Sequence, residues 1–205
     1  MSQKDRLIIG ITGASGVIYG IRFLQLLQNT PTETHLILSR AAERTIAYET
    51  DFKIREIKDM ADIVHDNSDI GASIASGSFR SRGMVIAPCS MKSLAEVASG
   101  VADNLIARAA DVILKERRRL VMMVRETPLH AGHLKNMLAA TECGAIIAPP
   151  VPAFYARPAS LDEMVTQSCG RVLDLFEIDL PETARWGDET APHHIPVTGK
   201  PRKAD

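Results

Sequence analysis

The sequence has few cysteines, almost no net charge and no long apolar run. Its 205 residues include three cysteines, Cys89, Cys143 and Cys169, which are far apart and form no Cys-x-x-Cys pair. This argues against a disulfide framework or a thiolate zinc site and is typical of a reducing cytoplasm, where isolated cysteines serve as small buried residues. The formal net charge is −1, so no overall field favours nucleic acid or an anionic membrane as a partner.

The chain also lacks the common membrane and catalytic motifs. No stretch approaches the roughly 18 consecutive apolar residues of a membrane-spanning helix, and the first residues show no signal-peptide pattern. There is no Gly-x-Ser-x-Gly and no His-Glu-x-x-His, and His130 and His133 are better interpreted as a helix start or as surface residues. We therefore expect a cytoplasmic protein with no membrane span, no bound metal and no serine-hydrolase triad.

Short apolar strands alternate with segments of helical spacing along most of the chain. This alternation predicts a doubly wound, mostly parallel sheet with helices on both faces, a three-layer α/β/α fold of Rossmann-like or flavodoxin-like type. We expect one domain over residues 1–186 and a polar tail or oligomer arm over 187–205. Strands are expected at 7–12, 35–38, 63–64, 84–87 (stopped by Pro88), 120–124 and 145–148. Helices are expected at 17–28, 40–50, 91–99, 103–118, 131–142 and 160–176.

A glycine-rich turn, Gly13-Ala14-Ser15-Gly16, follows the first strand and opens a helix. Small residues let the backbone approach a ligand, and a helix N-terminus favours a phosphate or ring oxygens. The segment is not Gly-x-Gly-x-x-Gly, and no acidic residue is placed for a ribose about 20 residues later. A mononucleotide is therefore favoured over a dinucleotide, with a simple tight turn as the alternative.

Hydroxyl side chains follow two further strands. Ser39 comes directly after the second strand, and Ser90 and Ser93 come directly after the strand at 84–87. A serine in such a position is often only a helix N-cap. Because the carboxyl ends of parallel strands share one edge of the sheet, however, the three together favour a ligand cradle.

Several donors later in the chain are of the kind that binds a phosphate monoester. Lys115, Arg125 and Arg171 are cations and Tyr155 is a hydroxyl donor, but spacing leaves open whether they meet. Glu126 could orient one of these cations or pair with it. Glu49, near the end of a predicted helix, is by itself more typical of a solvated surface carboxylate.

Taken in order, these residues resemble the UbiX-like flavin prenyltransferases, within a wider flavoprotein family that also contains flavin-dependent cysteine decarboxylases. The resemblance spans about residues 6–186 and is specific as an ordered set, whereas each motif alone is weak. The matching segments are Gly-Ile-Thr-Gly-Ala-Ser-Gly at 10–16, Ala-Ser-Gly-Ser-Phe at 75–79, Pro-Cys-Ser-Met-Lys-Ser-Leu-Ala at 88–95, Ala-Asp-Asn-Leu-Ile-Ala-Arg-Ala-Ala-Asp-Val at 102–112, Arg-Glu-Thr-Pro-Leu at 125–129 and Pro-Pro-Val-Pro-Ala-Phe-Tyr at 149–155.

The resemblance implies an enzyme that binds reduced FMN and dimethylallyl phosphate. It would join the dimethylallyl group to N5 and C6 of the flavin without a metal. The product, prenylated FMN, is the cofactor of UbiD-type decarboxylases, so such a decarboxylase is the implied partner. Whether dimethylallyl phosphate or the diphosphate is preferred stays open. Relatives form dodecamers with sites at subunit interfaces, and the same homo-oligomer is implied here.

The resemblance also implies roles for individual residues. The FMN set comprises Gly13, Ala14, Ser15 (near N5), Ser39, Ser90, Met91, Lys92, Ser93, Arg108 and Arg125. The dimethylallyl phosphate set comprises Lys115, Arg125, Glu126, Tyr155 and Arg171, with Trp186 closing the pocket. The catalytic set comprises Ser15, Glu49, Lys115 and Glu126, where Glu49 manages a proton at N5 or assists breakdown of the adduct.

One residue departs from the family pattern, and two rival functions stay open. Val124 stands where many relatives have proline, and a strand end accepts either residue. The first rival is a flavin-dependent decarboxylase of the peptidyl- or pantothenoyl-cysteine type, which typically has an Asn-containing motif where this chain has Pro88-Cys-Ser-Met-Lys92. The second is a flavin-binding, non-catalytic subunit of an aromatic-acid decarboxylase system.

Overall fold

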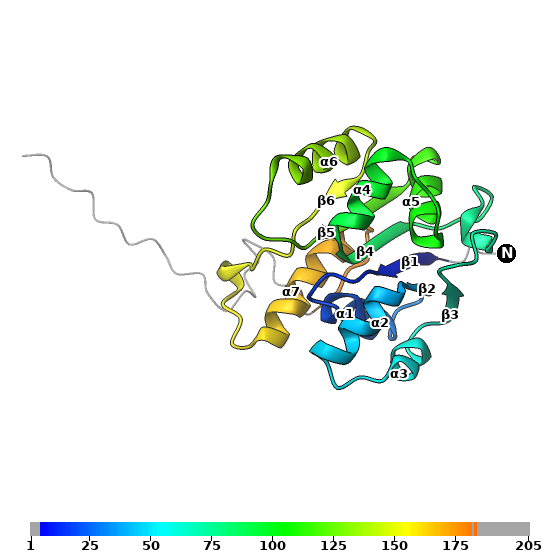
Figure 1. The fold of residues 1–205 in the computed structure, drawn as a ribbon. Coiled ribbons are helices and arrows are strands. Elements are labelled where there is room, and N and C mark those ends of the chain that lie inside the picture. The colour runs from blue at the N-terminus through cyan, green and yellow to red at the C-terminus, as the bar shows by residue number, and fades with distance from the viewer. Residues whose placement is uncertain (1–4, 182, 184–205) are drawn as a thin grey trace, which may run out of the picture.

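The protein folds around one parallel β-sheet of six strands in the order β3-β2-β1-β4-β5-β6 (Figure 1). The computed structural model describes residues 5–181 and residue 183. Each strand pair is parallel, so the predicted α/β class is confirmed. The strands are β1 (Arg6–Ile11), β2 (Glu33–Leu38), β3 (Ile63–Asp66), β4 (Gly83–Cys89), β5 (Arg119–Val124) and β6 (Ile146–Ile147).

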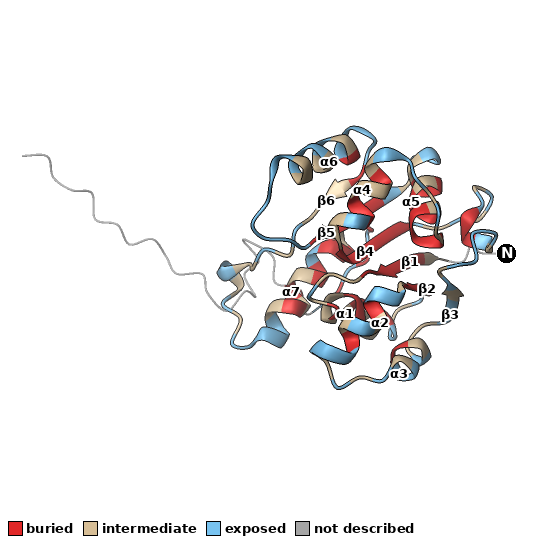
Figure 2. Ribbon diagram, viewed as in Figure 1, coloured by how far each residue is buried: buried red, intermediate tan, exposed pale blue. Residues whose placement is uncertain are grey.

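Helices cover both faces of the sheet, and each face has its own hydrophobic core. Alternate residues of β1 point to opposite faces, so Leu7 and Ile9 pack with α1, α2 and α7, whereas Ile8 packs with α4, α5 and α6. Figure 2 shows the central strands almost wholly buried. The helices are α1 (Ile18–Leu27), α2 (Arg40–Glu49), α3 (Ile54–Asp59), α4 (Met91–Ser99), α5 (Leu105–Lys115), α6 (Ala131–Glu142) and α7 (Leu161–Asp174), with short 3-10 turns η1 (Ser73–Ala75) and η2 (Phe154–Ala156).

The strand order reverses direction between β1 and β4, and this switch point positions the site. From β1 the chain adds β2 and β3 on one side, then returns to add β4, β5 and β6 on the other. The connections leaving β1 and β4 therefore diverge to opposite faces and open a crevice at the carboxyl edge. Ligands of open α/β sheets bind in such crevices, so the fold itself marks this edge for binding.

The structure corrects two predicted boundaries. Strand β4 does not stop at Pro88 but continues to Cys89, because the ladder to β5 shifts register after Ile86 and resumes at the pair Cys89 and Val124. Helix α5 ends at Lys115 rather than at 118, because Arg117 has a left-handed backbone (φ 57°) and cannot continue the helix.

Other predicted boundaries hold to within a few residues, and some predictions fall outside the described residues. The helix at 131–142 has the predicted limits, whereas α3 lies in a stretch that sequence patterns left unassigned. Trp186 and the tail at 187–205 lie outside the described residues. Within the described part of the chain, no helix is long and apolar enough to cross a membrane.

Candidate functional site

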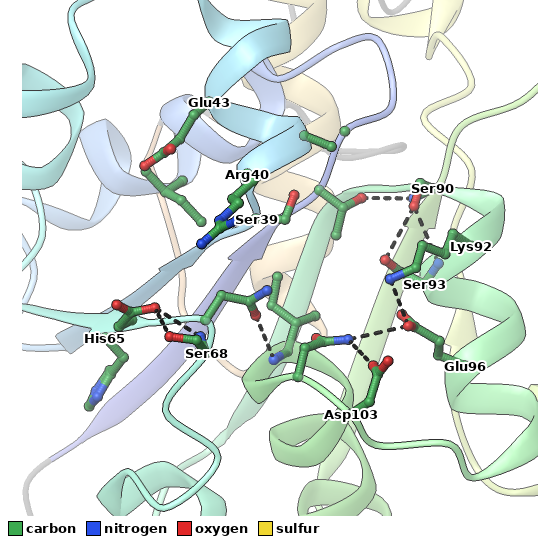
Figure 3. Close-up of a pocket in the computed structure, with 18 of the residues that line it drawn as sticks. Ser39, Arg40, Glu43, His65, Ser68, Ser90, Lys92, Ser93, Glu96 and Asp103 are labelled. Carbon is green, nitrogen blue, oxygen red and sulfur yellow. Dashed lines mark hydrogen bonds and ion pairs between the residues drawn. The ribbon is translucent and has the colours of Figure 1, made fainter.

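A cavity of about 830 Å³ lies at the carboxyl edge of the sheet, at the switch point (Figure 3). In Figure 3, Ser39 and Arg40 at the start of α2 face Ser90, Lys92 and Ser93 at the start of α4 across this space. The hydroxyl residues predicted to form a cradle after two strands thus share one cavity. The predicted site residues that line it are Gly13, Ser39, Ser90, Lys92 and Ser93.

The two strand ends at the switch point are joined by Thr12. Its Oγ1 donates to the carbonyl of Pro88 (2.7 Å) and accepts from the amide of Ser90 (2.8 Å). The side chain is almost fully buried, and its backbone amide also donates to the Pro88 carbonyl (3.3 Å). Pro88 has no amide hydrogen for the ladder, but its carbonyl accepts two hydrogen bonds from Thr12. Thr12 fixes the start of α4 against the glycine-rich turn.

The N-termini of α2 and α4 point unpaired amides at the cavity. Ser39 caps α2 by accepting from the amide of Ala42 (3.0 Å), and Ser90 caps α4 by accepting from the amide of Ser93 (3.3 Å). The first two amides of each helix have no hydrogen-bond partner in the described part of the chain. These amides, with the positive ends of two helix dipoles, make an anion-binding position between α2 and α4.

A third helix, α5, also begins at the cavity, but its amides are already occupied. Asn67 accepts from the amide of Leu105 with its carbonyl (2.8 Å) and from the amide of Ile106 with Oδ1 (3.1 Å). Asn104 caps the next amide, that of Ala107 (3.1 Å). The loop after β3 is therefore tied to α5 and forms a wall of the cavity, whereas the anion position belongs to α2 and α4.

The charged side chains that line the cavity are mostly paired. Lys92 forms an ion pair with Glu96 one turn later (2.8 Å), and that hydrogen bond raises the pKa of the lysine. Lys58 pairs with Glu43 (3.4 Å). Hydrogen bonds from Ser68 lower the pKa of Asp66, so this carboxylate stays charged and can accept hydrogen bonds from hydroxyl groups.

The glycine-rich turn lies against α2. The Glu49 carboxylate oxygen Oε2 accepts from the amides of Gly16 (2.8 Å) and Val17 (3.2 Å), so the last residue of α2 contacts the first turn of α1. Ser15 is exposed in this turn, directly before Gly16. Glu49 thereby contacts the two residues that directly follow Ser15, although it is far from them in sequence.

Arg125 and Glu126 follow β5 on the same edge. The Arg125 amide donates to the carbonyl of Cys89 (3.1 Å), which sets it beside the start of α4, and both side chains are exposed. Burial and the neighbouring Cys169 raise the pKa of the Tyr19 hydroxyl, while the positive charge of Arg125 opposes that rise. Arg125 therefore lies within electrostatic reach of the first turn of α1, which carries the glycine-rich turn.

The remaining predicted residues do not line this cavity in the described structure. Lys115 ends α5 and pairs with Glu116, so an 11-residue helix, about 16 Å long, separates it from the cavity. Arg108 pairs with Asp111 on α5 (2.8 Å). Arg171, in the last turn of α7, pairs with Asp174.

Two other predicted residues, Tyr155 and Met91, also lie outside the cavity lining. Tyr155 lies in η2 and is 40% exposed. Met91 supplies one of the unpaired amides at the start of α4, while its side chain packs against the core.

Sequence reasoning missed most of the polar residues that line the cavity, including Thr12, Arg40, Asn67 and Asn104. Thr12 and Asn67 act through hydrogen bonds to segments 39 to 78 residues away, which no local pattern reveals. Arg40 and Asn104 had a local signal, because each lies at a helix start and Asn104 directly precedes an apolar helical run.

An open parallel sheet with unpaired helix amides facing a cavity at its switch point defines a mononucleotide-binding α/β protein. Residues 1–172 match the Flavoprotein family. The chain is 58% identical over 181 residues to the flavin prenyltransferase UbiX of Thauera aromatica, covering 88% of this chain and 93% of that protein. The chain belongs to the UbiX group of flavin prenyltransferases within the Flavoprotein family.

Two solved structures agree with this assignment. AnUbiX (PadA1), in complex with FMN and dimethylallyl pyrophosphate, is 50% identical and superposes with a TM-score of 0.88, covering 90% of this chain and 98% of that chain. A dodecameric FMN-dependent UbiX-like decarboxylase from Escherichia coli O157:H7 is 47% identical, with a TM-score of 0.86 and coverage of 88% and 98%.

Proposed function

We propose that this protein is a flavin prenyltransferase that joins the dimethylallyl group of dimethylallyl phosphate to N5 and C6 of reduced FMN, without a metal. The observation that carries this proposal is the cavity at the switch point, with its unpaired amides on α2 and α4 and with Gly13 of the glycine-rich turn in its lining. Membership of the UbiX group supplies the reaction.

The cavity fits FMN in size and in chemistry. The unpaired amides at the starts of α2 and α4, with Arg40 and Lys92 beside them, suit the phosphate. Asp66 and Asp103 offer acceptors for the ribityl hydroxyls. The ring system would then lie along Gly13, Ala14 and Ser15, with Ser15 at N5.

The prenyl-phosphate half of the site is completed by another copy of the chain. Lys115 lies at the far end of α5 from the cavity and cannot reach it within one chain. We assign Lys115 to the site of a neighbouring copy, where it would join Arg125 and Glu126. Tyr155 and Arg171 complete this pocket. Trp186 is assigned to closing the pocket and Arg108 to binding FMN, as the sequence predicts. A dodecamer like that of the Escherichia coli O157:H7 structure brings such copies together.

The residues contribute to catalysis in three ways. Lys115, Arg125 and Arg171 stabilise the negative charge that grows on phosphate as its carbon–oxygen bond breaks. When bound, the flavin would supply the electron-rich N5, which displaces the phosphate, and C6, which adds to the prenyl double bond; C6 gives up one proton and the prenyl chain gains one, so the second bond needs no net proton. The turn carrying Ser15 orients N5 toward the prenyl carbon. Glu49 takes the proton that N5 releases when it is alkylated.

Prenylated FMN serves a second enzyme, and we assign that role to a UbiD-type decarboxylase in the cytoplasm. Solved cysteine-type decarboxylases share only the fold with this chain, at 15% to 17% identity for two of them.

The decisive experiment is mass spectrometry of the flavin after anaerobic incubation of the protein with reduced FMN and dimethylallyl phosphate. A flavin heavier by one prenyl unit establishes the transferase. A parallel incubation with the diphosphate shows which donor is used. Unchanged FMN, released from protein that demonstrably binds it, would overturn the proposal in favour of a passive flavin-binding subunit or a cysteine-type decarboxylase.

A further inference from the structure

The side-chain amide of Asn67, a residue of the cavity wall, is held in one orientation by the start of α5. Its Oδ1 accepts from the amide of Ile106, and only the oxygen of a side-chain amide can accept. The Nδ2 group must therefore point away from Ile106. In the described part of the chain the two hydrogens of Nδ2 have no hydrogen-bond partner, so they are available to a ligand.

Asn67 also lies beside the start of α2. The last pair of the β2–β3 ladder is Leu38 and Asp66, so Ser39 and Asn67 are the next residues on two neighbouring strands. Neighbouring strands lie about 4.8 Å apart, and both residues line the cavity. The Nδ2 donors are thus next to the helix start whose first two amides are unpaired in the described part of the chain.

Arg40 adds a charged donor at the same place. It is the first residue of α2, and Figure 3 shows its side chain on the side of the cavity where Ser68 lies, across from Lys92. Among the described residues Arg40 makes no ion pair, whereas both lysines that line the cavity are paired. Two backbone amides, one guanidinium group and one side-chain amide therefore converge on one space, and a phosphate group offers three oxygens that accept such donors.

We propose that Asn67 binds the phosphate of the flavin through Nδ2 and thereby makes the cavity select FMN over riboflavin. Riboflavin ends in a hydroxyl group where FMN carries the phosphate, so it has neither the charge nor the additional acceptor oxygens that these donors require. The inference rests on the proposed binding of FMN at this cavity and not on prenyl transfer.

A purely structural role is the alternative, because the oxygens of Asn67 already tie the loop after β3 to α5. Asn67→Ala removes both the tie and the donor. Asn67→Asp keeps an oxygen for the amide of Ile106 but replaces Nδ2 with a second carboxylate oxygen. Asn104→Ala is the matched control, because it deletes the acceptor of another α5 amide at the same cavity, and Nδ2 of Asn104 is already bound by two carboxylates.

For each full-length protein, flavin fluorescence titration gives the dissociation constants of FMN and of riboflavin, and thermal denaturation gives the melting temperature. In Asn67→Ala the preference for FMN over riboflavin should fall roughly tenfold, as for loss of a hydrogen bond to a charged group. In Asn67→Asp it should fall further, because the new carboxylate repels the phosphate, while the melting temperature stays close to that of wild type.

Asn104→Ala should lower the melting temperature by a few degrees, as loss of a helix cap does, and leave the preference for FMN within about twofold of wild type. A preference that falls equally in Asn104→Ala and Asn67→Ala would assign the effect to the start of α5 and refute the proposal.

Three further outcomes would overturn the proposal. An unchanged preference for FMN in Asn67→Ala and Asn67→Asp would leave only the structural role. Equal loss of FMN and riboflavin affinity in Asn67→Asp would place the contact on the part that the two flavins share. Wild-type protein that binds neither flavin would refute FMN binding as well. Wild-type protein that binds FMN but makes no prenylated flavin would refute the transferase alone, and the comparison of affinities would still decide the role of Asn67.

Discussion

The flavin half and the prenyl-phosphate half of the proposed site are built in contrasting ways. Around the flavin position, Thr12, Ser39, Asn67 and Ser90 are joined by hydrogen bonds within one chain, between strand ends and helix starts. The donors proposed for the prenyl phosphate are dispersed, and Lys115 lies at the opposite end of α5.

This contrast indicates what a single chain can pre-organise. An open parallel sheet brings its strand ends together by its own topology, so a ligand at that edge needs no second chain. A ligand that also needs the far end of a helix can meet it only across an interface. FMN binding should therefore be robust to changes at the distant residues, whereas prenyl transfer should not.

The largest expected effect comes from breaking the contact between the glycine-rich turn and α2. In Gly13→Ala the new methyl group would lie 2.3 Å from the Cβ of Ala41 and force the turn away from the helix. Overpacking of this kind costs about 1–3 kcal/mol, so FMN affinity should fall roughly tenfold to a hundredfold. Flavin fluorescence titration measures the loss.

Two variants test the stated cause. Gly13→Ala combined with Ala41→Gly removes the 2.3 Å contact and leaves backbone contacts of 3.1 and 3.2 Å with residue 41, so it should recover part of the affinity. Gly71→Ala is the matched control, because its Cβ would meet only Asp69 Oδ1 at 3.5 Å. A Gly13→Ala protein with wild-type affinity would refute the close-contact argument.

The next effect concerns the dispersed half. Lys115→Ala and Arg171→Ala should each lower kcat/KM for dimethylallyl phosphate by about tenfold or more, because a charged hydrogen bond to the phosphate is lost. FMN affinity should be unchanged. Steady-state kinetics with varied prenyl phosphate measure the use of the donor, and FMN titration measures flavin binding separately. Full turnover of either variant at low prenyl phosphate would contradict the placing of that residue in the prenyl-phosphate pocket.

Mixed oligomers sharpen the same comparison. Lys115→Ala copies keep Arg125, and Arg125→Ala copies keep Lys115. If sites combine residues of two copies, refolding the two weakened proteins together should restore intact sites in about a quarter of the positions by random mixing, and the rate should rise above that of either variant alone. If Lys115 served only its own chain, the rate of the mixture would be no higher than the average of the two variants.

A smaller effect distinguishes the helix N-termini. Ser90→Ala and Asn104→Ala each remove an N-cap and should each cost about 1 kcal/mol of stability. Only Ser90→Ala should also weaken FMN binding, by about fivefold, because α4 presents unpaired amides and those of α5 are taken by Asn67. Thermal denaturation and flavin titration of both variants give the comparison; equal loss of affinity would place the phosphate at α5.

The smallest effect is a pH dependence at the His35–His65 pair, of which His65 lines the cavity. The buried His35 ring stacks on His65 and shares a 2.9 Å hydrogen bond with it. Burial lowers the pKa of both rings below 6.5, against the opposing effect of Glu33 on His35. The unfolded chain therefore takes up protons before the folded one, so stability is fully present above about pH 6.5 and is lost as the pH falls from there toward the lowered values.

Urea denaturation of wild type and His35→Gln at about pH 7.5 and about pH 5.5 measures this term. Wild type should lose on the order of 1 kcal/mol more than the variant over that interval. Glu33, Asp62 and Asp69 are present in both proteins, but Glu33 contacts the His35 ring at 3.2 Å, so the difference reports the ring together with its contact to Glu33. Equal losses would mean that the pKa values of the two histidines are the same in the folded and the unfolded protein.

The sequence predicts most of the fold because its signals are local. The helix at 131–142 and the hydroxyl residues after two strands follow from short-range patterns. The end of β4 could not be predicted, because Pro88 has no amide hydrogen for the ladder, and the strand continues only because the ladder to β5 shifts register and resumes at the pair Cys89 and Val124. The contacts of Glu49 and Asn67 are long-range hydrogen bonds, and only the assembled sheet brings their partners close.

The two outer strands of the sheet are short, with four residues in β3 and two in β6. Long unpaired edges invite another chain to add a strand, which leads to open-ended stacking rather than closed assemblies. These edges offer little for such pairing. Copies of this protein should therefore meet through helices and loops, which suits a closed shell whose size is set by symmetry and in which every flavin pocket has the same neighbours.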